Sequence, residues 1–157
     1  MKRIIHKQLF KPLLVFLKQG MTAHKIALTL SLGLTVGIMP TLGTSWILLV
    51  IAVMFRLNVL ALQVVHIAIT GIQLALFVPF LKMGQILFNL PNLPFELNNI
   101  MHLLRYDFPD TFVHVWRVYI SGLFVWLVIA IPAGIGVYKL SLPYFRRYKR
   151  KMELKAR

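Results

Sequence analysis

Three long stretches without a formal charge constrain this chain more than any other feature. They cover residues 26–55, 57–81 and 118–138, and they are 30, 25 and 21 residues long. A run of about 20 apolar residues is enough for one helix to cross a bilayer. The chain is also 59% hydrophobic and 14% charged, whereas soluble domains carry about 25% charged residues. These patterns predict an all-α, polytopic membrane protein whose single domain spans residues 1–157.

The basic residues lie mainly at the two ends of the chain. The net charge is +14; six of the 18 Lys and Arg residues lie in the first 25 positions, and eight lie from Lys139 onward. Basic ends around apolar runs are typical of membrane proteins whose ends stay in the cytoplasm near anionic lipid heads. This distribution argues against a nucleic-acid partner. It predicts membrane lipids as partners and a basic cytoplasmic tail at residues 139–157.

Residues 1–20 have the pattern of a basic amphipathic helix. Lys7, Lys11 and Lys18 share one face, while leucines and a phenylalanine occupy another. We predict an interfacial helix on the inner leaflet, bent near Pro12. The alternative is a surface helix that packs on the protein's own spans.

The first apolar stretch is interrupted in its middle by turn-forming residues. The sequence Met-Pro-Thr-Leu-Gly-Thr-Ser at residues 39–45 combines helix breakers with hydroxyl residues that cap helices. We predict two short helices, near residues 23–39 and 45–56, joined by a tight turn. Thr44 or Ser45 is the expected N-cap of the second helix.

Charge also predicts the topology. The segment 89–115 holds three of the four acidic residues, so we expect it to be an external loop. With both termini in the cytoplasm, spans near residues 57–81 and 116–138 cross in opposite directions. The segment 23–56 must then return to its starting side, either as a re-entrant hairpin or as two short crossings. The predicted location is the bacterial inner membrane.

The turn in the first stretch is the candidate binding site. Backbone inside lipid must be sheltered by protein or water, and helix starts attract anionic groups. Two further polar residues, seven positions apart on one helix face, lie in the second stretch. The predicted substrate-binding residues are Pro40, Thr41, Gly43, Thr44, Ser45, His66 and Gln73. The alternatives are a plain connection for the turn and structural hydrogen bonding for the other two residues.

Small residues recur at four-residue spacing in two of the stretches. Gly33 and Gly37 form one such step, and Ala130 and Gly134 form another. Small side chains let helices approach closely in lipid, so we predict helix packing at these positions. The two cationic residues that border the second stretch, predicted to contact lipid headgroups, are Arg56 and Lys82.

Catalytic chemistry has little support in the sequence. Cysteine is absent, and the three apolar stretches contain no Asp or Glu. Nucleophilic thiols, thiolate metal sites and carboxylate proton relays are therefore excluded from these stretches. We predict that the protein is not an enzyme and has neither a cofactor nor a metal site.

A family resemblance adds to this reading. The motifs that carry it are Gly33-x-x-x-Gly37-x-x-Pro40-x-x-Gly43, Ala52, Arg56-Leu57-Asn58, Gln73, Pro79-Phe80 and Lys82-x-Gly84. This pattern, over a core at residues 23–88, resembles the bacterial membrane family known as domain of unknown function 2062. His66, Gly71 and Gln85 depart from residues common in the family. The resemblance implies a link to glycosyltransferases, and so to cell-envelope metabolism.

Two functions remain open from the sequence. The first is binding or translocation of a lipid-linked or other anionic amphiphilic substrate, without catalysis. The second is a scaffold or accessory role for a glycosyltransferase or another envelope enzyme. A homo-oligomer would be one way to enclose a path, because one 18.1 kDa copy has few spans.

Overall fold

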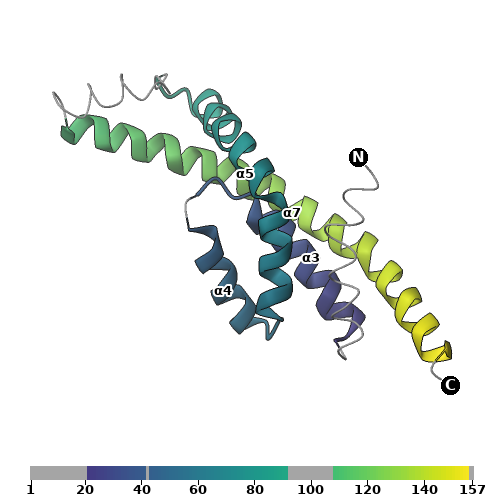
Figure 1. Cartoon of the computed structure of the whole chain (residues 1–157). Helices are drawn as coiled ribbons and strands as arrows, with labels where there is room; N and C mark the ends of the chain where they lie inside the picture. Colours follow the sequence, from purple (N-terminus) through teal and green to yellow (C-terminus); the bar gives the residue numbers. More distant parts are fainter. Residues whose placement is uncertain (1–20, 42, 92–107, 156–157) are drawn as a thin grey trace.

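The computed structural model describes residues 21–41, 43–91 and 108–155, and all regular elements in these ranges are α-helices (Figure 1). In chain order they are α3 (Ala23–Gly37), α4 (Thr44–Met54), α5 (Val59–Leu87) and α7 (Phe108–Lys155). The predicted all-helical class is confirmed for this part of the chain. The predicted helix at residues 1–20 and residues 92–107 of the predicted loop lie outside the described residues.

The predicted break in the first apolar stretch is confirmed, because α3 and α4 are separate helices that form a hairpin. We call residues 38–44 the hairpin tip. The predicted N-cap was wrong: Gly43 caps α4, in place of Thr44 or Ser45. Gly43 has a φ of 82°, a left-handed conformation that glycine adopts at little cost. Its carbonyl accepts a hydrogen bond from Trp46 N at 2.9 Å, which closes the first turn of α4.

α5 is longer than the predicted span at residues 57–81. It starts where Asn58 Oδ1 accepts a hydrogen bond from Ala61 N at 3.0 Å, and it continues to Leu87. Lys82 ends the uncharged run but does not end the helix, because lysine is a good helix former. Pro79 lies inside α5 and removes one backbone hydrogen bond. Figure 1 shows the two halves of α5 pointing in different directions.

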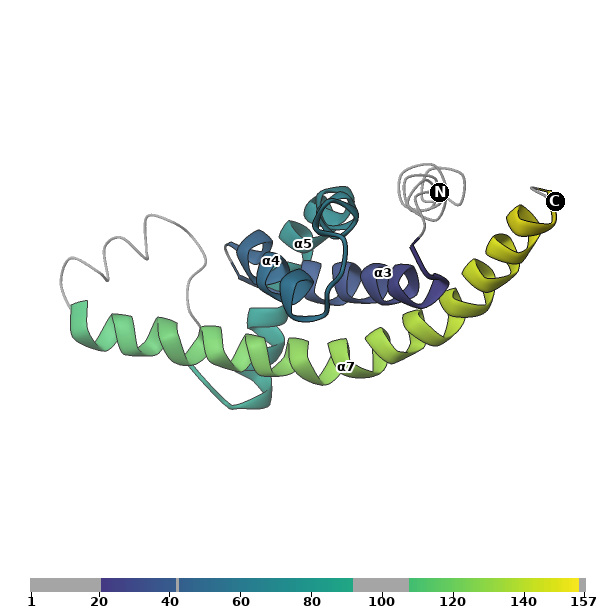
Figure 2. The same cartoon turned by 90° about the horizontal axis from the view of Figure 1, so that it is seen from below.

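α7 is one helix of 48 residues, about 72 Å long at about 1.5 Å per residue. Its middle contains the predicted span at residues 116–138. Residues 108–115, predicted as loop, are helical, and so are residues 139–155 of the predicted tail. The predicted span was bounded by its first charged residues on either side. The helix itself continues past them, because lysine and arginine have good helix propensity. Figure 2 shows α7 as a curved rod, and Pro132 and Pro143 lie within it.

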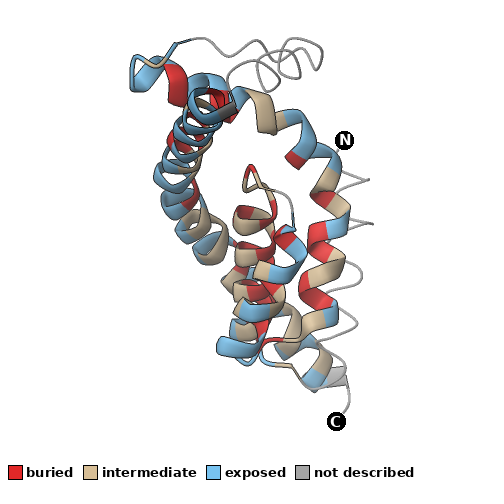
Figure 3. Ribbon diagram, turned by 90° about the vertical axis from the view of Figure 1, so that its left-hand side faces the viewer, coloured by how far each residue is buried: buried red, intermediate tan, exposed pale blue. Residues whose placement is uncertain are grey.

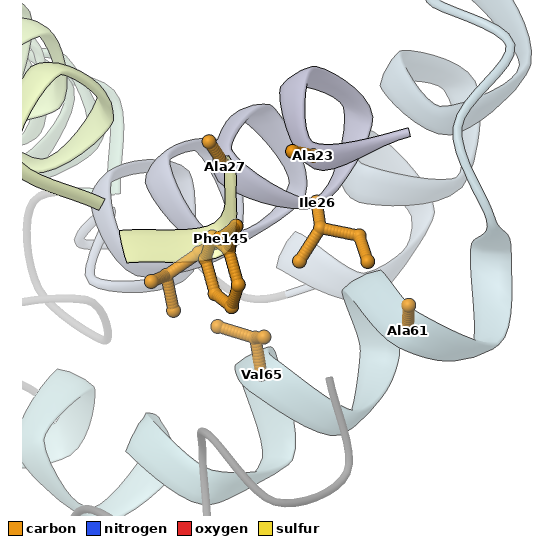
Figure 4. Packing of buried hydrophobic residues seen from close by; sticks show 7 residues of the cluster. Ala23, Ile26, Ala27, Ala61, Val65 and Phe145 are labelled. Atoms are coloured by element: carbon orange, nitrogen blue, oxygen red, sulfur yellow. The ribbon is translucent and has the colours of Figure 1, made fainter. Parts of the chain in front are cut away.

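The helices meet in three apolar clusters. The largest joins α3, α5 and α7 and consists of Ala23, Ile26, Ala27, Leu30, Ala61, Val65 and Phe145 (Figure 4). A second cluster, which includes Leu48 and Leu62, joins the hairpin to the first half of α5. The third holds the second half of α5 against α7 through Leu81 and Val118. In Figure 3 the buried positions lie where the helices face one another.

One end of the molecule gathers the start of α3, the end of α4 and the last part of α7. Lys25 Nζ donates to Arg56 O at 3.1 Å, and His24 Nδ1 is hydrogen-bonded to Tyr138 OH at 2.6 Å. The hairpin therefore leaves from and returns to the same end. We call this the basic end; its described cationic residues are Lys25, Arg56, Lys139, Arg146, Arg147, Lys149, Arg150 and Lys151.

In the part of the chain that the structure describes, two helices are long and apolar enough to cross a membrane, by length and composition alone: α5 and residues Pro109–Leu154 of α7. Large apolar side chains on the outer surface are widely exposed, for example Trp46 (74%), Ile67 (71%) and Leu140 (79%). So much exposed apolar surface is normally covered by lipid or by another protein.

Candidate functional site

The hairpin tip is fastened to α5 by one glutamine. Gln73 Nε2 lies 3.0 Å from Met39 O, 3.2 Å from Thr41 O and 2.8 Å from Thr44 Oγ1. Gln73 is 8% exposed and Thr44 is 2% exposed. A buried carbonyl without a hydrogen-bond donor is costly. The Gln73 amide supplies a donor to carbonyls that have no helical partner where the helix is broken. Gln73 therefore acts as a hydrogen-bond donor to the tip.

α7 also holds the tip, through a tyrosine. Tyr119 OH donates to Thr41 Oγ1 at 2.6 Å, and Thr44 Oγ1 donates to Thr41 O at 3.1 Å. One helical turn before the tip region, Trp126 Nε1 donates to Thr35 O at 2.9 Å. Polar side chains of α5 and α7 thus converge on the end of α3 and the start of α4.

The other predicted residues of the tip differ in exposure. The Pro40 side chain is fully buried, whereas Gly43 and Ser45 are exposed. The carbonyl of Ser45 accepts a hydrogen bond from Gln63 Nε2 at 3.0 Å. The structure therefore brings Thr41, Thr44 and Gln73 together and leaves Ser45 at the margin.

His66 lies on the same side of α5 as Gln73, as the spacing predicted, but it does not reach the tip's hydrogen bonds. It is 6% exposed, and its Nδ1 lies 3.3 Å from the position that an added Cβ on Gly37 would occupy. Among the described residues this Nδ1 has no hydrogen-bond partner. Thr70 Oγ1 donates to His66 O at 3.1 Å, a bond within the same helix. His66 is thus packed between α5 and α3.

The described residues of the tip are held by a network of hydrogen bonds. The hydroxyl of Thr44 both donates and accepts, and the Gln73 amide nitrogen faces three acceptors. None of the described side chains in the tip carries a charge. An anionic ligand would have to compete with these hydrogen bonds for the Thr44 hydroxyl and the Gln73 amide. Substrate binding by the tip stays a prediction, and the geometry fits the structural alternative well.

The two predicted headgroup residues lie at opposite ends of the apolar part of α5. Arg56 is exposed and joins α4 to α5 with a φ of +50°. Lys82 is exposed near the other end of α5. Both positions are compatible with membrane surfaces on either side of the apolar stretch between them.

The predicted packing glycines lie at helix contacts. An added Cβ would lie 2.7 Å from Val65 Cγ1 at Gly33 and 2.6 Å from Ile69 Cδ1 at Gly37, so both glycines let α3 approach α5. On α7, the carbonyl of Gly134 accepts a hydrogen bond from Ser31 Oγ at 2.7 Å. Ala130 is 7% exposed on the same helix.

Sequence reasoning missed the contact between α5 and α7. An added Cβ at Gly84 would lie 2.6 Å from Gly122 N, and one at Gly122 would lie 3.2 Å from Leu81 Cα. The available signal was the small pair Ser121–Gly122, which was not singled out. The contact of Tyr119 with the tip was also missed, because a tyrosine near the end of an apolar stretch is typical of a membrane interface and gives no sign of such a bond.

Within the described ranges, His, Asp and Glu form no group of three or more that could hold a metal ion. No match was found among curated proteins or among solved structures. A family model described as "Uncharacterized protein conserved in bacteria (DUF2062)" matches residues 2–153. The match covers nearly the whole chain, including the flanks that carried no recognisable motif. The chain therefore belongs to the bacterial DUF2062 family.

Proposed function

We propose that this protein is a multi-pass protein of the bacterial inner membrane with both termini in the cytoplasm. The cationic residues of the basic end support this orientation, because Lys and Arg are retained on the cytoplasmic side. The contacts between His24 and Tyr138 and between Lys25 and Arg56 bring together the chain segments that carry these residues. The only acidic residue described at the other end of α7 is Asp110.

In this proposal the α3–α4 hairpin is re-entrant. α3 has 15 residues and α4 has 11, about 22 Å and 16 Å long, against an apolar bilayer core of about 30 Å. The tip bonds to Gln73, which has 14 residues of α5 before it and 14 after it. Measured along α5, the hairpin therefore enters to about half the depth and returns.

The proposed role is non-enzymatic binding of an anionic amphiphile on the lipid-facing surface. The observation that carries it is the contrast between an internally paired tip and an exposed apolar surface bordered by cations. An amphiphile matches this surface, since its chain can lie along apolar helix faces while its head meets Lys or Arg. The paired tip then serves as the rigid support of the hairpin.

Single-cysteine labelling tests the layout, because the chain contains no cysteine of its own. Ser45→Cys should resist a membrane-impermeant maleimide added from outside, whereas Ile100→Cys should react. Arg157→Cys should react only after the membrane is opened. Labelling of Ser45→Cys from outside would mean two full crossings, and labelling of Arg157→Cys would overturn the orientation.

Lipid retention tests the role. The purified protein in neutral detergent should retain anionic lipids over zwitterionic ones in native mass spectra. Equal retention of both classes would overturn amphiphile binding. If an envelope enzyme co-purified in that case, the accessory role would take its place.

A further inference from the structure

A groove lies at the end of the molecule opposite the basic end, between the last turn of α5 and the first third of α7. It has a volume of about 460 Å³ and is lined by Phe88, Leu90, Arg117, Ile120, Ser121 and Phe124. The rings of Phe88 and Phe124 meet edge to face, with centroids 5.6 Å apart. Five of the six lining residues offer apolar surface or a hydroxyl, and one offers a charge. We call this the Arg117 groove.

The backbone determines the shape of this groove. Gly84 and Gly122 let α5 and α7 approach closely just before α5 ends. Beyond α5, Gln85 Nε2 donates to Pro91 O at 3.1 Å, and His114 Nε2 is hydrogen-bonded to the same carbonyl at 3.2 Å. These bonds fasten the segment after α5 to α7. The groove is therefore a preformed feature of the helix crossing.

Among the described residues that line the groove, Arg117 alone carries a charge. It is exposed, and within the described ranges it has neither a hydrogen bond nor an ion pair. The hydroxyl of Ser121 is already used, because it donates to Val118 O at 2.7 Å. Among the described lining groups, the guanidinium is thus the polar group available to a ligand.

The position of Arg117 along α7 places it at a membrane surface in the proposed layout. It directly precedes the uncharged stretch at residues 118–138. Trp116 beside it is 54% exposed, as expected for an aromatic residue at a membrane surface, and its ring centroid lies 5.7 Å from that of Tyr119. The groove runs from this level toward Phe124, which is deeper in the apolar stretch.

We propose that the Arg117 groove binds a phosphate-headed lipid, with its apolar chain between Phe88, Ile120 and Phe124 and its phosphate on Arg117. A guanidinium can form two parallel charge-assisted hydrogen bonds with a phosphate, which an ammonium cannot. The apolar walls give a free phosphate ion nothing further to contact. This assignment rests on the proposed amphiphile binding. It further specifies where the lipid binds, that its headgroup carries a phosphate, and that it comes from the outer leaflet.

The test measures affinity of the full-length protein in neutral detergent for three probes. They are phosphatidic acid, diacylglycerol with the same chains, and inorganic phosphate. The wild type should bind phosphatidic acid best. Arg117→Gln should weaken that binding on the order of tenfold, the effect of losing a charge-assisted pair. Ile120→Trp places a larger side chain in the groove from a half-exposed position. It should weaken the binding of phosphatidic acid and of diacylglycerol to the same extent.

The matched control is Arg146→Gln, which removes one charge at the basic end, outside the groove, and should weaken phosphatidic acid binding far less than Arg117→Gln does. Arg117 has no partner among the described residues, so Arg117→Gln should keep the wild-type thermal midpoint without lipid. Equal binding of phosphatidic acid by wild type, Arg117→Gln and Ile120→Trp would overturn the groove and leave the proposed function standing. If the wild type did not prefer phosphatidic acid to diacylglycerol, the proposed function would fail too. Binding of inorganic phosphate as tightly as the lipid would overturn the lipid assignment.

Discussion

The hairpin tip and the Arg117 groove differ in the burial and hydrogen bonding of their polar groups. In the tip, Gln73 and Thr44 are buried and bonded to each other and to the backbone. In the groove, Arg117 is exposed and bonded to no described residue. A buried polar group must be paired to be tolerated, so it holds the fold together. An exposed charge above apolar walls needs no internal partner and is available to a ligand.

Both regions depend on α5, but on different halves of it. The first half packs on the hairpin and leads to Gln73 at the middle of the helix, while the second half crosses α7 at Gly84. Variants can therefore disturb one region and spare the other. If the comparison is right, tip variants change stability and groove variants change lipid binding.

The largest effect is expected at the crossing that forms the groove. Gly84→Ala would place a Cβ 2.6 Å from the backbone nitrogen of Gly122, so α5 and α7 must move apart. We expect a loss of about 3 kcal/mol in the free energy of unfolding, together with loss of lipid retention. The unfolding midpoint in detergent and native mass spectra measure the two effects.

The matched control is Gly71→Ala on the same helix. No atom lies within 4 Å of an added Cβ at Gly71, so alanine should raise stability by up to about 1 kcal/mol through helix propensity. If Gly84→Ala were as stable as Gly71→Ala, the close approach of α5 and α7 would be wrong.

The next effect is expected in the tip. Gln73→Leu keeps a side chain of similar volume but leaves the carbonyls of Met39 and Thr41 without this donor. We expect the free energy of unfolding to fall by about 2 kcal/mol. Gln63→Leu is the control: the half-buried Gln63 amide has one hydrogen-bond partner among the described residues, Ser45 O, so the loss in the free energy of unfolding should be smaller. Unchanged stability of Gln73→Leu would mean that the tip does not need its donor.

Gln73→Leu also tests whether lipid binding in the groove is independent of the tip. Retention of phosphatidic acid by Gln73→Leu should match the wild type, because Gln73 does not line the Arg117 groove. If the lipid were lost, the tip would belong to the binding site and the original prediction for Thr41, Thr44 and Gln73 would be restored.

The helices and the hairpin break were accessible from the sequence, because they follow from local chemistry. Pro40 and Gly43 interrupt an apolar run, and Asn58 is a favoured residue for a helix N-cap. The helix ends were less accessible: Lys82 and Lys139 end apolar runs, yet α5 and α7 continue through them. Charge marks where lipid should end, whereas helix propensity and packing decide where a helix ends.

The groove could not be predicted, since it depends on pairing distant segments. Gly84 and Gly122 are 38 positions apart, and nothing local shows that they meet. Arg117 borders an apolar stretch as Arg56 does, and the sequence does not reveal which of the two lies beside a groove. The hydrogen-bond partners of Tyr119 and Gln73 likewise became visible only with α5 and α7 placed against the tip, although structural hydrogen bonding by Gln73 was one of the two predicted roles.

A smaller effect separates two residues that are two positions apart on α7. Tyr119→Phe removes the hydroxyl that donates to Thr41 Oγ1, so stability should fall by about 1 kcal/mol while lipid retention is unchanged. Arg117→Gln should weaken lipid retention and leave stability unchanged. A double-mutant cycle with Thr41→Val should give a coupling energy of about 1 kcal/mol for the Tyr119–Thr41 pair. Additive losses in that cycle would argue against a direct bond.

The smallest effect concerns the two ends of α5, which both have a residue with left-handed backbone. Arg56 precedes the helix with a φ of 50°, and Asn89 follows it with a φ of 49°. Asparagine tolerates this conformation better than arginine, so Arg56→Asn should raise the free energy of unfolding by about 0.5 kcal/mol and Asn89→Arg should lower it similarly. The backbone carbonyl that Lys25 Nζ reaches is kept in Arg56→Asn. Arg146→Asn controls for the lost charge, and equal midpoints for Arg56→Asn and Arg146→Asn would show that backbone strain at Arg56 has no measurable effect.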